Sequence, residues 1–344
     1  MGSREMIGNP DTAGWMHLAA FVVLILPMNL LAGGAVIAAV TAMSPGAHAV
    51  RLSAWMTGSL PGAAVWTIAA GLPALWIRDR ISGSNGPGQG WPLREIAIFL
   101  AVAALAHLAL VRRPESRRSS AVRSVFALAV TAIGLACALG MSPGAPRFSD
   151  PTLLPRFLHM LVAAIAVAGM LVALHGLRAW RFDAAYGDWV MRLGVRWFVI
   201  PTAVQMVVGF SLLLSLPGPV RSRFLGGSPV ATAEMAIGIA LAIAVLFVAT
   251  HAAHAADPRS LVTFGAALLA ATLLAMSLLR EQIAAAHPPG DPEILAGPPR
   301  APVEIALVAA VLLIVAAGAG FWMARRVAAL PPEAGTPGAG GSKR

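Results

Sequence analysis

The sequence predicts an all-α polytopic membrane protein with about nine transmembrane helices. Of its 344 residues, 58% are apolar and only 12% are charged, and the mean hydropathy is +0.77. The apolar residues form long unbroken runs of about 20 residues, the length at which a helix crosses a bilayer. These observations exclude a water-soluble enzyme and a disordered chain. They also exclude a transmembrane β-barrel, whose strands are short and alternate in polarity.

Nine apolar spans follow one another along the chain, and turn-forming residues such as Ser44-Pro45-Gly46 and Pro217-Gly218-Pro219 separate them. The first span is too long for a signal-peptide core and no basic segment precedes it, so we expect it to stay in the mature protein. Residues 1–330 are predicted to form one helical bundle, and the Pro/Gly-rich residues 331–344 a disordered tail. The predicted spans are 16–43, 53–77, 95–112, 122–142, 154–178, 194–216, 230–252, 259–280 and 302–324.

The basic residues predict the orientation of this bundle. All but one of the 25 are arginines, the exception being Lys343 in the tail. With nine spans, the N-terminal side carries ten basic and ten acidic residues, and the other side fifteen basic and five acidic. The positive-inside rule therefore places the N-terminus outside and the C-terminus in the cytoplasm. The net charge of +10 is read as a topology signal and not as a nucleic-acid-binding surface.

The histidines at the ends of spans are the main candidates for a site inside the membrane, where polar groups are costly. Neutral imidazole is a common ligand of haem iron, although an interfacial histidine can equally bond a carbonyl group or water. The single cysteine, Cys137, excludes disulfides, a thiolate zinc site and a Cys-ligated iron–sulfur cluster. The candidate histidines are His17, His107, His159, His175, His251 and His254.

The spacing of these histidines limits the arrangements that are possible. His159 and His175 are 16 residues apart, a rotation of about 160° at about 100° per residue, so they face opposite ways. This disfavours two haems stacked along one helix face, as in a bc₁-type cytochrome b. Met235 lies early in span 7, at about the depth of His159, and could supply an axial sulfur ligand. Glu95 opens span 3, and Arg156 lies three residues before His159.

Several segments resemble subunit I of cytochrome bd-type quinol oxidases. "WMHLAAFVVLILPMNLLAGG" is similar to the first span of that family, and "PTLLPRFLHMLVAAIAVAGMLVALHGLRAW" to its fifth. The nine spans with an external N-terminus also fit. The resemblance implies that His17 and His159 are haem ligands, with His159 on the outer low-spin b haem and Met235 as its second ligand. In "WPLREIAIFL", Glu95 matches an acid close to the haems. Arg156 is a candidate partner for the haem propionates.

The chain also departs from the family pattern. The loop between spans 6 and 7, where family members bind quinol, spans only about Pro217 to Pro229. Span 8 lacks the glutamate haem ligand and the Gly-Arg-Gln-Pro-Trp motif, leaving Arg280-Glu281-Gln282. Span 3 has His107 at about the depth of the family's second glutamate. We therefore expect no oxygen reduction by this chain.

These observations predict a subunit that holds one or two b haems in the bacterial inner membrane. It would exchange electrons between membrane quinone or quinol and a partner redox protein, and so could be the quinol-oxidising subunit of an oxidoreductase complex. The partner is expected to be a periplasmic c-type cytochrome or iron–sulfur subunit, with membrane lipid around the bundle. The alternatives are a solute transporter, for which Pro27-Met28-Asn29 and Pro201-Thr202 with Gln205 are the best support, and a haem-free membrane anchor.

Overall fold

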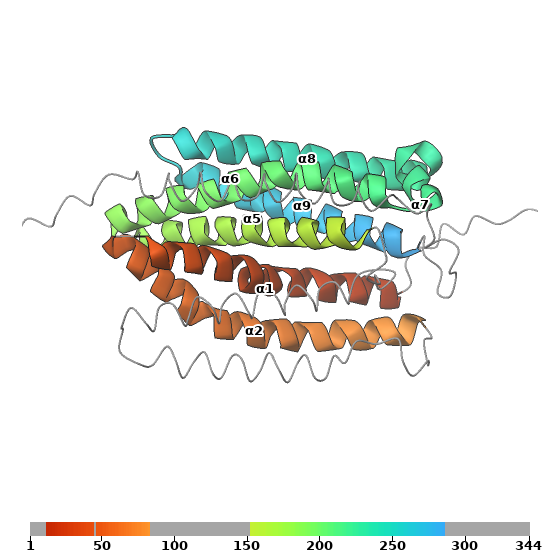
Figure 1. Cartoon of the computed structure of the whole chain (residues 1–344), viewed down its shortest axis with the longest axis horizontal. Coiled ribbons are helices and arrows are strands. Elements are labelled where there is room, and N and C mark those ends of the chain that lie inside the picture. Colours follow the sequence, from red (N-terminus) through yellow and green to blue (C-terminus); the bar gives the residue numbers. More distant parts are fainter. Residues whose placement is uncertain (1–11, 45, 83–151, 286–344) are drawn as a thin grey trace, which may run out of the picture.

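The computed structural model describes residues 12–44, 46–82 and 152–285, and the ordered elements in these ranges are all helical. Figure 1 shows them as long rods lying along one direction. In chain order they are α1 (Thr12–Met43), α2 (Ala47–Ser82), α5 (Leu153–Ala179), α6 (Ala184–Ser215), the short α7 (Gly218–Ser222), the π-helical turn η1 (Arg223–Gly227), α8 (Pro229–His254) and α9 (Arg259–Ala285).

The all-helical prediction agrees with the described residues, where six of the predicted spans correspond to helices α1, α2, α5, α6, α8 and α9. Five segments in this part are long and apolar enough to cross a membrane, and α2 contributes none of them. The predicted spans 95–112, 122–142 and 302–324 lie outside the described residues, as does the predicted tail 331–344. The total of nine spans and the orientation therefore remain predictions. The five segments that are long and apolar enough to cross a membrane are Ile25–Met43, Leu153–Ala179, Ala184–Ser215, Pro229–His254 and Arg259–Arg280.

Helix α6 starts ten residues before the predicted span because its first turns are polar but still helical. The side chain of Asp183 caps the helix by accepting a hydrogen bond from the backbone N–H of Tyr186. Arg192 then pairs with Asp188 one turn earlier, and its guanidinium donates to the carbonyl groups of Ala255 and Ala256 beyond α8. Hydropathy detects only the part of a helix that is apolar, so these turns were not predicted.

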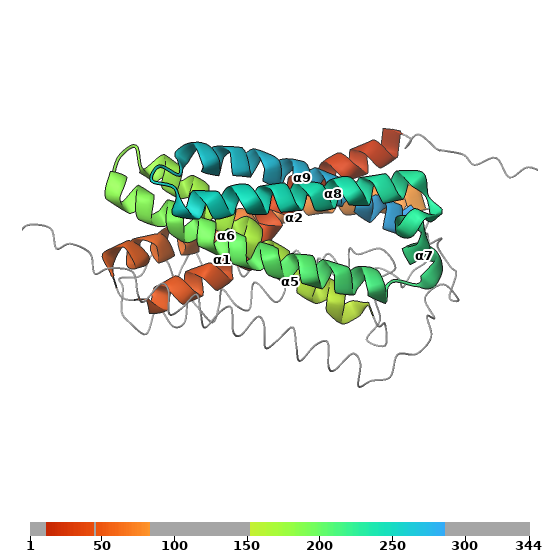
Figure 2. The same ribbon diagram turned by 90° about the horizontal axis from the view of Figure 1, so that it is seen from above.

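Two apolar cores hold the helices together. One joins α1 and α2 to α5 and α6 through residues such as Ile37, Met56, Val172 and Trp197. The other joins α5 and α6 to α8 and α9 through residues such as Met170, Phe198 and Val245. Figures 1 and 2 show α5, α6, α8 and α9 as neighbours, with α1 and α2 on the side of α5. The α5–α6 pair is thus the centre of the described bundle.

The bundle has two distinct ends. The α7 end, as we call it, holds α7, the end of α6 and the starts of α5 and α8 (Figure 1). The opposite end, which we call the turn end, holds the turns from α1 to α2, α5 to α6 and α8 to α9. At the turn end Arg51 pairs with Asp183 at 2.7 Å, and Arg259 lies 4.0 Å over the ring of Trp180. In the predicted topology, the α7 end faces outward and the turn end faces the cytoplasm.

Candidate functional site

The α7 end contains buried polar atoms that lack a hydrogen-bond partner within the described residues. They are Nδ1 of His159 on α5, Oε1 of Gln205 on α6 and Oε2 of Glu234 on α8. A buried polar atom without a partner costs about 1–3 kcal/mol, so each of these atoms needs an explanation. Three of the five such atoms in the described residues belong to helices at this end, which makes it the candidate site. The other two are Oη of Tyr186 in the first turn of α6 and Nε1 of Trp197 near its middle.

His159 is the residue around which the site is built. It lies six residues after Leu153, the first residue of α5, and is partly buried. Its ring faces α6 at Gly209, because a Cβ atom placed on Gly209 would lie 3.4 Å from Cε1 and 3.6 Å from Nδ1 of the imidazole. These are ordinary van der Waals distances, so the imidazole edge lies directly against this turn of α6. The role of Gly209 was not predicted from the sequence, although the close antiparallel pairing of α5 and α6 sets it opposite His159.

Met235 occupies the corresponding position in α8, counted from the start of the helix. It lies six residues after Pro229, where α8 begins, so that His159 and Met235 are each about 9 Å along the axis from the start of their own helix. Met235 is partly buried against an apolar cluster that closes the α7 end. That cluster contains Leu216, Val220, Phe224 and Ala231, with Leu279 and Ile283 of α9 alongside. Met235 and His159 thus hold matching positions along their own helices, and their equal depth in the membrane stays a prediction.

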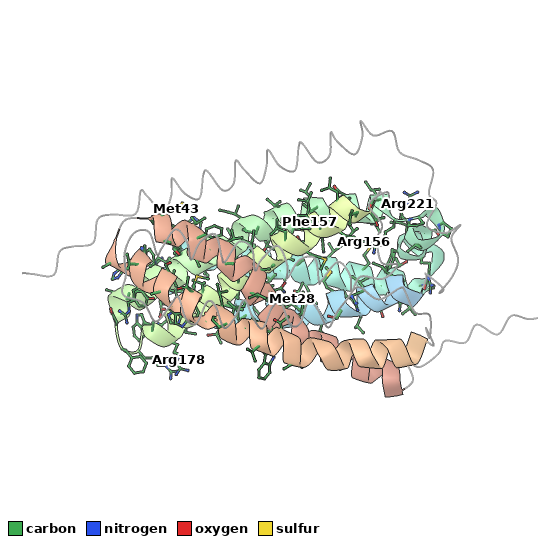
Figure 3. The ribbon with its side chains drawn as sticks, turned by 60° about the horizontal axis from the view of Figure 1, so that its bottom comes forward. Met28, Met43, Arg156, Phe157, Arg178 and Arg221 are labelled. Atoms are coloured by element: carbon green, nitrogen blue, oxygen red, sulfur yellow. The ribbon has the colours of Figure 1, made fainter. Side chains whose placement is uncertain are left out.

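Arg156 lies one turn before His159, further toward the α7 end. Its residue exposure is only 6%, although it carries a charge. Figure 3 shows Arg156 on the same side of the molecule as Arg221 of α7, whereas Arg178 lies at the other end of α5. A cation at this position can act on negative groups that enter the α7 end.

Glu234 adds a carboxyl group beside Met235. The side chain of Gln282 on α9 hydrogen-bonds to this carboxyl group, while Oε2 has no partner among the described residues. Gly238, one turn later, lets Met276 and Leu279 of α9 pack close to α8. Gln282 belongs to residues 280–282, where the sequence departs from the family pattern. Its hydrogen bond to Glu234 places this part of α9 beside the candidate site.

The structure does not bring the remaining described histidines to this site. His175 is stacked on Trp55 at the turn end, with ring centroids 3.7 Å apart and planes 12° from parallel. His251 and His254 are exposed at the end of α8, and His251 is 16 residues, or about 24 Å of helix, beyond Met235. Nδ1 of His254 is 2.9 Å from the carbonyl oxygen of Thr250 in its own helix.

The other predicted site residues are only partly accounted for. The backbone of His17 lies in the second turn of α1, at the α7 end (Figure 1). Glu95 and His107 lie outside the described residues. Within the described ranges, no group of three or more His, Cys, Asp or Glu side chains could hold a bare metal ion. A haem needs fewer protein ligands, because the porphyrin itself supplies four of the six positions on the iron.

No protein-family model matches the chain, and no curated protein is significantly similar to it in sequence. Among solved structures, the chain is similar to the bd oxidase from Geobacillus thermodenitrificans, with a TM-score of 0.61. The similarity covers 91% of this chain and 98% of that chain, at 10% sequence identity. At this level of identity the likeness is one of fold, and the conclusion is that this chain shares the helical fold of that bd oxidase.

Proposed function

We propose that the chain is a distant relative of subunit I of cytochrome bd-type quinol oxidases, and that it holds haem b and transfers electrons in the bacterial inner membrane. The observation that carries the proposal is the imidazole of His159, whose buried Nδ1 faces Gly209 of α6 and has no hydrogen-bond partner among the described residues. The shared fold with a bd oxidase supports it. Electrons would pass between membrane quinone or quinol and a partner redox protein.

The residues present fit a haem. Nε2 of His159 would ligate the iron from α5, and the sulfur of Met235 from α8. When bound, haem b supplies one-electron transfer between the ferric and ferrous states. The apolar cluster around Met235 would exclude water from a haem bound there and, together with the two ligands, would set its reduction potential. Arg156 would pair with the propionates and orient them toward the α7 end.

The proposal includes no oxygen reduction by this chain. Reduction of oxygen consumes protons, and a buried site needs ionisable groups to deliver them. The glutamate ligand expected in span 8 is missing, and span 3 has His107 where a second acid is expected. The proposal keeps His17 as a haem ligand and Glu95 as an acid close to the haem, because both match the family pattern. The number of haems in the proposal is one or two.

A partner subunit completes the proposal. The connection from α6 to α8 is residues 216–228, which include α7 and η1, and these 13 residues are too few to fold into an electron-accepting domain. We therefore propose that a periplasmic c-type cytochrome or iron–sulfur subunit docks at the α7 end. The alternative of a transporter has less support, because α1 and α6 continue as helices through Pro27 and Pro201.

The test is the haem content of the purified full-length chain. Wild-type protein should show the reduced-minus-oxidised spectrum of b haem, and His159→Ala should lose most or all of it while still accumulating in the membrane. His254→Ala is the matched control and should keep the haem, because His254 is exposed at the turn end. Quinol-driven, cyanide-sensitive oxygen uptake by the wild-type protein would contradict the absence of oxygen reduction. Wild-type protein without haem would overturn the whole proposal.

A further inference from the structure

Two of the unpaired buried atoms at the α7 end are complementary. Nδ1 of His159 can carry a proton and donate a hydrogen bond, whereas Oε1 of Gln205 can only accept a hydrogen bond. They belong to α5 and α6, which pack tightly against each other. Neither atom has a hydrogen-bond partner within the described residues. Joining them would satisfy both.

The register of the two helices places Gln205 near His159. The helices are antiparallel, since Gly169 packs against Trp197 and Phe198, and Gly176 packs against Met191. Continued toward the α7 end, the same register sets His159 opposite Gly209, where the contact is observed. Gln205 lies four residues before Gly209 and so occupies the same face of α6, one turn away.

The orientation of the imidazole leaves Nδ1 free for such a bond. A histidine in a helix commonly bonds a carbonyl oxygen of its own helix through Nδ1, and His254 does so with Thr250 at 2.9 Å. His159 makes no such bond, and its Nδ1 instead lies on the α6 side of the ring. A metal-ligating histidine generally donates its second N–H to an acceptor, which fixes the tautomer and the ring orientation.

We propose that Gln205 is a positioning residue for the haem ligand, and that its Oε1 accepts a hydrogen bond from Nδ1–H of His159 when the haem is bound. This inference rests on the proposed function. The bond would keep the proton on Nδ1, so that the lone pair of Nε2 faces the iron. It would also raise the basicity of the imidazole and thereby stabilise the ferric state.

The test compares variants that keep or lose the acceptor oxygen at position 205. In Gln205→Leu the ferric state loses stabilisation, so the midpoint potential should rise. We expect about a 10-fold change in the ferric-to-ferrous ratio at a fixed potential, or ~59 mV for a one-electron couple. Gln205→Glu keeps an acceptor oxygen and should have a potential at or below that of the wild type. The g values of the low-spin ferric haem should change in Gln205→Leu and report the altered imidazole.

The control is Ser211→Ala. The hydroxyl group of Ser211 donates a hydrogen bond to the carbonyl group of Val207 in its own helix at 3.1 Å, so its removal should leave the midpoint potential unchanged. If Gln205→Leu fails to assemble, Gln205→Met, of similar length and without an amide, takes its place. A wild-type potential and wild-type g values in the variant without an acceptor would overturn this inference while leaving the haem proposal intact. So would a raised potential in Gln205→Glu. A wild-type protein without haem would overturn both.

Discussion

At the scale of single residues, His159 and His254 show how one residue type takes two roles. Both are in long apolar helices, but His254 is exposed and its Nδ1 lies 2.9 Å from the carbonyl oxygen of Thr250. The Nδ1 of His159 is buried and has no partner in the described part of the chain. An interfacial histidine that is satisfied by its own helix needs no ligand. The unsatisfied one is the better candidate, for an energetic reason that the sequence does not display.

Asp183 at the turn end should make the stability of the fold depend on pH. The backbone N–H of Tyr186 and the guanidinium of Arg51 both hydrogen-bond to this carboxyl group and lower its pKa below the usual 3.8. Since the folded-state pKa is lower than the unfolded one, ionised Asp183 stabilises the fold above about pH 4. The contribution is lost as the pH falls toward the folded-state pKa.

The measurement is the unfolding of detergent-solubilised wild type and Asp183→Asn between pH 7 and pH 3. The wild type should be the more stable protein at pH 7, and the difference should shrink as the pH falls below about 4. Asn can still cap α6 but has no charge to offer Arg51. A difference that stays constant over this range would show that the charge of Asp183 contributes nothing.

At the scale of helices, glycines allow the α5–α6 pair to approach closely. A Cβ atom on Gly169 would lie 2.5 Å from the backbone carbon of Trp197, and one on Gly176 would lie 2.4 Å from the backbone nitrogen of Met191. From α6, a Cβ atom on Gly194 would lie 2.3 Å from the backbone nitrogen of Ala173. Small residues of this kind are how membrane helices gain close packing. The pairing sets the register that brings Gly209 opposite His159.

Replacing one of these glycines should therefore loosen the pair. Gly176→Ala forces a methyl group against the backbone of α6, and overpacking of this kind costs about 1–3 kcal/mol. We expect a lower unfolding midpoint in detergent, and a lower haem content as the register relaxes. Gly62→Ala in α2 is the control, because a Cβ atom there meets nothing within 4 Å. Equal midpoints for the two variants would contradict this account of the packing.

At the scale of the whole molecule, the distribution of basic and acidic residues predicts which end of the bundle faces the cytoplasm. Two of the three arginine clusters on the predicted cytoplasmic side, at residues 112–123 and at Arg325-Arg326, lie outside the described residues. Exposed residues at the two ends of the described bundle can test this prediction instead. Leu225 of η1 is 60% exposed at the α7 end, and Phe182 is 85% exposed between α5 and α6 at the turn end. These two positions report opposite faces of the membrane.

Cysteine labelling tests this topology directly. With the single native cysteine removed by Cys137→Ser, Leu225→Cys should react in intact cells with a maleimide that cannot cross the inner membrane. Phe182→Cys should react only after that membrane is permeabilised, since the positive-inside rule places the turn end in the cytoplasm. The reverse pattern would invert the orientation and place the His159 site on the cytoplasmic side.

The sequence by itself determined the membrane class and the approximate places of the six long helices α1, α2, α5, α6, α8 and α9, because apolarity is a property of each residue in turn. It also indicated His159, Arg156 and Met235 through their local context and the family resemblance. It missed the polar first turns of α6, where Asp183 caps the helix and Arg192 is paired. Those turns are stabilised by hydrogen bonds and ion pairs that hydropathy does not register.

Only the tertiary structure decided which of the candidate histidines lie away from His159. It separated His175, His251 and His254 from His159, and it set Gly209 against the imidazole, with Gln205 one turn away on the same face. These relations depend on the register between helices, which is fixed by contacts such as that of Gly169 with Trp197. Such contacts join residues far apart in the chain. A run of apolar residues specifies that a helix will form, but it does not specify which neighbour that helix packs against or in what register.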